Sequence, residues 1–142
     1  MIVPDLNVLL YAVDSSSVRH QVAKAWLERA INESGHEIGV PWVVHLGFLH
    51  LTTSVKVFPH PMAVEQSLAW LDHLHSSPSV VSINPGRAHA GILRHLLLTV
   101  GTGGNLTTDA HIAALALEND ATIATGDRDF LRFPGLKVEF PY

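Results

Sequence analysis

Residues 1–13 of the chain read MIVPDLNVLLYAV. A short β-branched run, Ile2 and Val3, is followed by Pro4 and Asp5, and a mostly apolar segment then runs from Leu6 to Val13. This order predicts a strand that ends at an aspartate and passes directly into a helix. Ligands of open α/β sheets bind beyond the carboxyl ends of the strands, so Asp5 occupies a position where a functional side chain is expected.

The rest of the chain continues the same alternation of short β-branched runs and longer helical segments, which is typical of an α/β domain. We predict a central, mostly parallel sheet of four to five strands with helices on both faces. The predicted strands span residues 2–3, 38–40, 80–83, 122–125 and 138–140, and the predicted helices span residues 6–13, 20–34, 42–52, 62–75, 87–100 and 109–119. Thr108 is expected to cap the last of these helices. Three glycines between positions 101 and 104 predict a loop.

Length and composition are those of an ordinary globular domain. The 142 residues are enough to bury one core, so we expect residues 1–142 to form a single domain. Hydrophobic residues make up 47% of the chain and charged residues 15%, which excludes a disordered chain. The same composition favours coverage of part of the surface by another protein.

Cysteine and net charge exclude further classes of function. The chain has no cysteine, which excludes thiolate nucleophiles and a disulfide framework and fits a reducing cytoplasm. The first apolar run is shorter than the roughly 20 residues that cross a bilayer, so we expect no signal peptide and no membrane span. A formal charge of −4 argues against broad electrostatic binding of nucleic acid. It does not exclude a nuclease, because a bound metal ion offsets clustered acids locally.

Two more aspartates occupy positions comparable to that of Asp5. Asp127 follows the predicted strand 122–125, and Asp109 begins a helix in which Ile112 and Ala116 share its inward face. Taken singly, Asp109 could stabilise a helix N-terminus and Asp5 could be a turn residue. Carboxylates gathered at one edge of a sheet would repel, and one would become protonated unless a cation were present. We therefore predict that Asp5, Asp109 and Asp127 hold a divalent metal ion.

The ligand types indicate which metal this would be. Oxygen ligands alone predict Mg²⁺, or alternatively Mn²⁺, which retains several waters and suits phosphate chemistry. The ten histidines are the competing signal for zinc or nickel, but no metalloprotease helix motif is present. We expect most of these histidines to be surface or partly buried spacers, with His45 and His50 as candidates to line the cleft.

Three stretches of sequence carry the acids: IVPDLNVLLYA at residues 2–12, GNLTTDAHIAALA at residues 104–116 and TGDRDF at residues 125–130. In this order and spacing they resemble the acidic motifs of PIN-domain ribonucleases, specifically the VapC branch of bacterial toxin–antitoxin pairs. The likeness covers nearly the whole chain. It implies a PIN-like three-layer sandwich and assigns catalytic and metal-binding roles to Asp5, Asp109 and Asp127.

One position departs from the family pattern. The family usually carries a glutamate on the helix after the second strand, and the matching stretch VVHLGFL at residues 43–49 places Gly47 there. The predicted helix 42–52 contains no other acid. Glu37 and Glu65 are candidates to substitute by a different route. We therefore expect an acidic ring with one carboxylate fewer than usual.

The resemblance also implies a reaction and its partners. The reaction would be hydrolysis of RNA phosphodiester bonds, with Mg²⁺ polarising the phosphate and lowering the pKa of the attacking water. Asp129 is a less favoured substitute for Asp127, and Arg128, Arg132 and the loop 101–104 are candidates to contact the RNA backbone. The chain would be a cytoplasmic toxin that forms a homodimer and a hetero-oligomer with a cognate VapB-type antitoxin, whose tail fills the cleft.

Two other interpretations remain open from the sequence. A haloacid-dehalogenase-type phosphatase also places an aspartate after its first strand, but its second aspartate, two positions on, is Asn7 here. A PIN-domain protein that binds its antitoxin and cleaves RNA weakly or not at all is the stronger alternative, because Gly47 stands where the glutamate is expected.

Overall fold

The computed structural model describes residues 1–33 and 35–142, and in these residues it contains one five-stranded sheet. The strands are β1 (Ile2–Pro4), β2 (Ile38–Pro41), β3 (Val80–Ile83), β4 (Thr122–Ala124) and β5 (Lys137–Glu139). They lie in the order β3-β2-β1-β4-β5, and every neighbouring pair is parallel. The predicted α/β class is confirmed, with β5 as the edge strand expected near the end of the chain.

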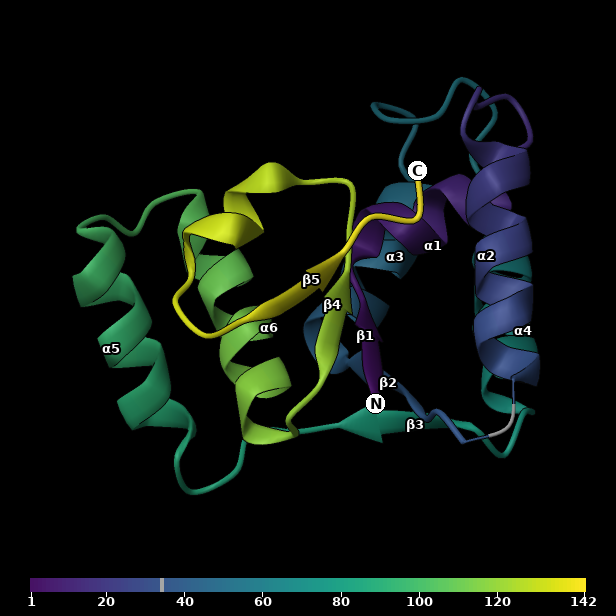
Figure 1. Ribbon diagram of the computed structural model, residues 1–142. Helices are drawn as coiled ribbons and strands as arrows, with labels where there is room; N and C mark the ends of the chain where they lie inside the picture. Colours follow the sequence, from purple (N-terminus) through teal and green to yellow (C-terminus); the bar gives the residue numbers. More distant parts are fainter. Residues whose placement is uncertain (34) are drawn as a thin grey trace.

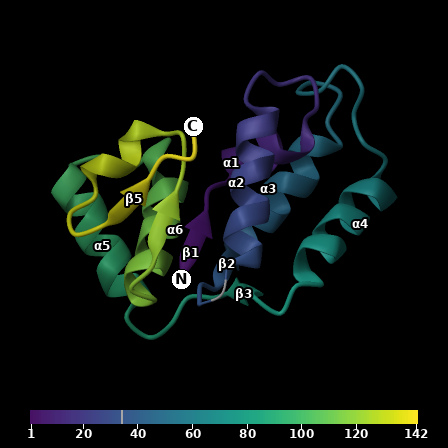
Figure 2. The ribbon, with the colours of Figure 1, turned by 45° about the vertical axis from the view of Figure 1, so that its right-hand side comes forward.

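Helices cover both faces of this sheet, as predicted. They are α1 (Leu6–Val13), α2 (His20–Asn32), α3 (Trp42–Thr52), α4 (Val64–His75), α5 (His89–Val100), α6 (Leu106–Glu118) and a short 3-10 helix, η1 (Arg128–Arg132). In Figure 1, α5 and α6 lie on one side of the central strands and α1, α2 and α4 on the other, and Figure 2 shows the same arrangement after rotation. No helix in the described ranges is long and apolar enough to cross a bilayer.

The register of the two central strands determines where the site forms. Val3 lies opposite Ile123 and Pro4 opposite Ala124, so β1 and β4 end at the same level. Val3 and Ile123 are fully buried, as expected for parallel strands that are covered on both faces. The residues that follow these strands, Asp5 and Thr125, therefore emerge side by side at the carboxyl edge of the sheet.

The prediction that Thr108 caps α6 is wrong. The helix begins at Leu106, which places Thr108 inside its first turn. Gly104 adopts a positive φ of 55°, and the amides of Leu106 and Thr107 bond to the carbonyls of Gly103 and Gly104. Leu106 is only 6% exposed. Glycine turn geometry and burial of a leucine therefore start the helix earlier than the capping pattern indicates.

Other predicted boundaries differ slightly from the structure. α4 and α5 begin at Val64 and His89, later than predicted, and β5 begins at Lys137, one residue earlier than predicted. α2 ends at Asn32, and the last residue of the predicted helix, Ser34, lies outside the described residues. The glycine-rich segment 101–105 forms a turn region, as predicted.

Candidate active site at the carboxyl end of the sheet

Asp5 joins the ends of the two central strands. Its backbone amide donates to the carbonyl of Ala124 at 2.8 Å, and its side chain is buried, with the residue 6% exposed. Oδ1 accepts from the amide of Leu6 at 2.7 Å, which caps α1. Oδ2 accepts from the hydroxyl of Thr125 at 2.8 Å. Asp5 thus caps α1, a role that the sequence suggested for Asp109 and not for Asp5, and both of its carboxylate oxygens are fixed in orientation.

Thr125 connects Asp5 to Asp127. Its side chain is fully buried, and its Oγ1 accepts from the backbone amide of Asp127 at 2.9 Å while donating to Asp5. Asp127 in turn caps η1, because its Oδ1 accepts from the amide of Asp129 at 2.8 Å. One buried hydroxyl therefore bonds to both aspartates and fixes the position of one relative to the other. Thr125 was not among the predicted site residues, because its bridging role depends on a contact between segments that lie 120 residues apart.

Asp109 reaches the same place from α6. It lies in the first turn of the helix, and Ile112 and Ala116 on its face are buried, as predicted. Its charge interacts with those of Asp5, Asp127 and Asp129. The structure therefore brings all three predicted aspartates into one electrostatically coupled group.

Burial and mutual repulsion make this group unfavourable when every member is charged. Burial, followed by the charges of Asp5, Asp127 and Asp129, raises the pKa of Asp109 from 3.8 to about 6. Burial also raises the pKa of Asp5, and the hydrogen bonds from Thr125 and Leu6 oppose that shift. The repulsion among carboxylates that the sequence predicts is thus present in the folded chain.

The donor chemistry fits a hard divalent cation. The coupled groups are all carboxylates, whose oxygens are the ligands that ions such as Mg²⁺ prefer. Among the described residues, no three histidine or carboxylate side chains stand close enough to form a ready-made metal cage. The carboxylates are thus electrostatically coupled without forming a closed set of metal ligands.

Gly47 lies beside this site. It is half-buried on α3, and a Cβ built at this position would lie 2.6 Å from Cδ2 of Leu6, the residue that follows Asp5. The suggestion that Glu37 replaces the missing glutamate is wrong, because its carbonyl bonds to the amide of Ile2 at the amino edge of the sheet. Glu65 is exposed in the first turn of α4.

His45 is buried between helices instead of facing the acids. Its Nδ1 donates to the carbonyl of Pro41 at 3.0 Å, and its Nε2 lies 2.5 Å from Nε2 of His75 at the end of α4. Burial, and then the neighbouring His75, lower the pKa of His45 against the opposing effect of the Pro41 carbonyl. His50 is exposed on α3.

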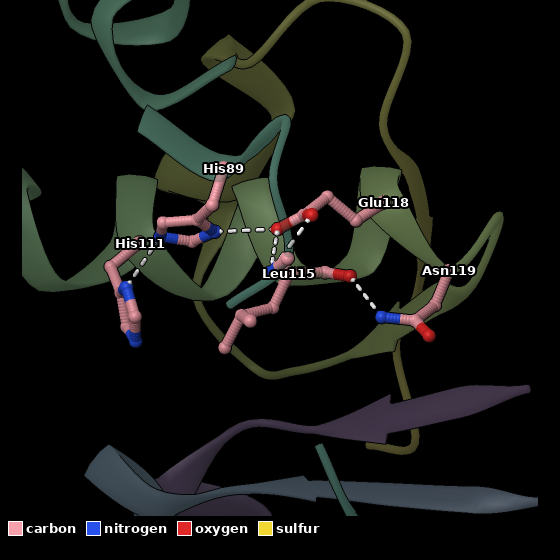
Figure 3. A network of polar contacts seen from close by, with 6 residues as sticks. His89, His111, Leu115, Glu118 and Asn119 are labelled. Atoms are coloured by element: carbon pink, nitrogen blue, oxygen red, sulfur yellow. Dashed lines mark hydrogen bonds and ion pairs between the residues drawn. The ribbon is translucent and has the colours of Figure 1, made fainter. Parts of the chain in front are cut away.

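A second histidine network joins α5 to α6 (Figure 3). His89 lies 2.8 Å from Oε1 of Glu118 through Nδ1 and 2.9 Å from Nδ1 of His111 through Nε2. Glu118 also accepts from the amide of Gly86 at 3.0 Å. These groups hold the N-terminal end of α5 against α6, which carries Asp109 at its other end.

The arginines near the site differ in their partners. Arg132 lies 3.8 Å from Oδ1 of Asp129, and both side chains are about half exposed. Arg128 lies over the ring of Phe140 at 5.6 Å. Asp129 thus lies near Arg132 while its charge also acts on Asp109, and its lower rank as a candidate ligand stays a prediction.

Comparison with known proteins agrees with the motifs. The PIN-domain family matches residues 2–136. Ribonuclease VapC37 of Mycobacterium tuberculosis is 42% identical over 141 residues, which cover 99% of this chain and 97% of the relative. Ribonuclease VapC33 of the same species is 39% identical over 142 residues, covering 99% and 98%.

A solved structure supports the fold. The crystal structure of VapBC2 from Rickettsia felis, bound to a DNA fragment from its promoter, contains a chain that matches with a TM-score of 0.73 at 22% identity. The match covers 99% of this chain and 98% of that chain. The sequence relatives give no support to the phosphatase alternative. The chain belongs to the PIN-domain family and, within it, to the VapC ribonucleases.

Proposed function

We propose that residues 1–142 act as a single PIN domain that hydrolyses RNA phosphodiester bonds, as the toxin of a type II toxin–antitoxin pair. The convergence of Asp5, Asp109 and Asp127 at the carboxyl ends of β1 and β4 carries this proposal. It is supported by the near full-length identity of 42% to a ribonuclease. The reaction takes place in the cytoplasm, where such an RNA substrate occurs.

Asp5, Asp109 and Asp127 would together hold Mg²⁺, with Mn²⁺ as the alternative. When bound, the ion supplies a positive charge that polarises the phosphate and lowers the pKa of an attacking water. Thr125 aims Oδ2 of Asp5 and fixes the backbone of Asp127 through its own hydroxyl. Of the three aspartates, Asp109 is the one whose pKa the neighbouring acids raise most clearly. A bound cation would therefore stabilise its negative charge against their repulsion.

A VapB-type antitoxin is the proposed protein partner, within a hetero-oligomer that contains a toxin homodimer. Structures of VapBC complexes match this fold, including VapBC-1 from nontypeable Haemophilus influenzae with a TM-score of 0.70. The chain also exposes apolar side chains on its helices. Val22 on α2 is 50% exposed, and Leu68 on α4 is 45% exposed. An antitoxin that covered either side chain would remove it from water.

Cleavage of RNA by Asp-to-Asn variants tests the proposal. We expect the parent to cleave structured RNA with Mg²⁺, and Asp5→Asn or Asp109→Asn to lose more than the roughly 10- to 100-fold that supporting residues of metal sites contribute. Asp72→Asn, an exposed change on α4, should leave cleavage unchanged.

The same assay decides the remaining alternative. Gly47 favours a protein that binds an antitoxin without cleaving RNA. If the folded parent left RNA intact at saturating Mg²⁺ or Mn²⁺, the binding-only interpretation would hold and the ribonuclease proposal would be wrong.

A further inference from the structure

A cavity of about 250 Å³ adjoins the acidic group and shares Asp127 with it. It is formed by α1, the segment before α2, the turn after β4 and the last residue of the chain, which Figure 1 shows beside α1. We call it the arginine subsite, and its other lining residues are Asn7, Tyr11, Arg19, Gly126, Arg128 and Tyr142.

Arg19 is held in this subsite by two aromatic rings. Its guanidinium carbon lies 5.3 Å from the ring centroid of Tyr11 and 5.1 Å from that of Tyr142. The two rings meet edge to face with centroids 5.3 Å apart. Among the described residues, no carboxylate lies within ion-pair distance of Arg19. Cation–π contacts and a long hydrogen bond of 3.5 Å from Nη1 to the Tyr11 hydroxyl therefore orient the guanidinium, while its charge and its other N–H donors remain available to an anion.

Tyr142 contributes an unused hydrogen-bond donor. Its hydroxyl is the one buried side-chain polar atom of the described residues that has no hydrogen-bond partner. Burial, and then the neighbouring Tyr11 and Asp5, raise the pKa of Tyr142, so the hydroxyl remains protonated. A buried donor without a partner is costly, and an acceptor oxygen on a ligand would satisfy it.

Gly126 allows Tyr142 to occupy this position. A Cβ built on Gly126 would collide with the Tyr142 ring, so only the bare glycine backbone lets the ring pack on the turn that carries Asp127. The motif residues 125–127 therefore connect the acidic group and the arginine subsite directly.

We propose that the arginine subsite binds a phosphate of the RNA backbone other than the one that is cleaved, through Arg19, Arg128 and the Tyr142 hydroxyl. The groups on offer are hydrogen-bond donors and positive charges, which match a phosphodiester. The faces of Tyr11 and Tyr142 are engaged with Arg19, which disfavours base stacking. For a chain with a formal charge of −4, such a local cationic point would hold an anionic substrate beside the acids.

This inference rests on the proposed ribonuclease activity and predicts an effect on substrate binding. Arg19→Gln should raise KM for a single-stranded RNA about tenfold and change kcat less than about twofold, because the contact is equal in ground and transition states. Tyr142→Phe, which removes only one oxygen, should raise KM about threefold, in the range of one neutral hydrogen bond. Arg29→Gln, an exposed charge loss on α2, is the matched control and should leave KM unchanged.

Salt dependence gives a readout that a purely structural role would not change. In Arg19→Gln, the slope of log affinity against log salt should fall in magnitude by about 0.7, the value for one phosphate contact on a single strand. Affinity can be measured by fluorescence anisotropy in an Asp109→Asn background, which separates binding from cleavage.

Two outcomes overturn the subsite. One is that Arg19→Gln and Tyr142→Phe match Arg29→Gln in KM and in salt slope, and the other is that they lose kcat alone. If Arg19→Gln does not fold, the KM of Tyr142→Phe alone decides whether the subsite binds RNA. A parent that binds labelled RNA but cleaves none contradicts the ribonuclease proposal, while the anisotropy comparison still tests the subsite.

Discussion

At position 47, α3 lacks a side chain where related sequences are expected to carry a glutamate. The structure shows what a restored side chain would meet. Its Cβ would come within 2.6 Å of a terminal methyl carbon of Leu6, which can move by rotation because it is the end of a flexible side chain. Leu6 follows Asp5 directly and donates to its carboxylate. Position 47 therefore lies against the residue that follows Asp5, and we predict that a restored glutamate affects metal binding.

Gly47→Glu should tighten Mg²⁺ binding about tenfold, the order of change that supporting residues produce at metal sites. Gly47→Gln is the control, because it fills nearly the same volume and displaces Leu6 equally but adds no charge. The measurement is a calorimetric Mg²⁺ titration of both variants and the parent. Equal dissociation constants for Glu and Gln would show that the carboxylate at this position does not reach the ion.

α6 is the element that combines the two polar groups of this half of the molecule. Its first turn carries Asp109 on an apolar face, and His111 and Glu118 face α5. His89 and Glu118 have side chains only 10% and 12% exposed. The α5–α6 contact thus depends on a nearly buried polar network, and truncating one member leaves the others without partners.

Glu118→Gln should lower the free energy of unfolding by about 1–3 kcal/mol, the cost of weakening a buried, charged hydrogen-bond acceptor. Glu28→Gln on α2 provides the comparison, because Glu28 is 62% exposed and its ion pair with Lys24 spans 4.0 Å. Urea unfolding of both variants measures the difference. A loss no larger than that of Glu28→Gln would mean that apolar packing alone joins the two helices.

The order and type of the elements could be predicted from the sequence because hydrophobic periodicity and glycine or proline breaks are local signals. The start of α6 could not, because the turn at Gly104 and burial of Leu106 outweighed the capping preference of Thr108. The positions of the three aspartates at strand and helix ends were visible in the sequence. The bridging role of Thr125 and the placement of Tyr142 were not, because both depend on contacts between distant segments.

The acidic site makes the stability of the whole molecule depend on pH and on metal. The pKa of Asp109 is about 6 in the folded chain and near 3.8 when unfolded, so between these values the folded state holds more of the proton. Stability from this residue is therefore greatest at low pH and is lost as pH rises toward about 6. Burial lowers the pKa of His45 and His111. Their contribution to stability changes with pH in the opposite direction, because the unfolded state binds protons more readily than the folded state below about pH 6.5.

Comparison with Asp109→Asn separates these opposing effects, because the variant keeps both histidines. Without metal at pH 7.5, Asp109→Asn should unfold at a higher temperature than the parent, since it removes a charge that three neighbouring acids repel. This advantage should shrink as the pH falls from 6 toward 4, where the parent carboxyl becomes protonated. Added Mg²⁺ should raise the Tm of the parent and raise that of the variant much less, because only the parent retains the full ligand set. Melting curves at several pH values, with and without Mg²⁺, measure all three effects. A metal-free variant less stable than the parent at pH 7.5 would show that Asp109 stabilises the fold, and repulsion among the acids could then no longer be the reason that the site binds a cation.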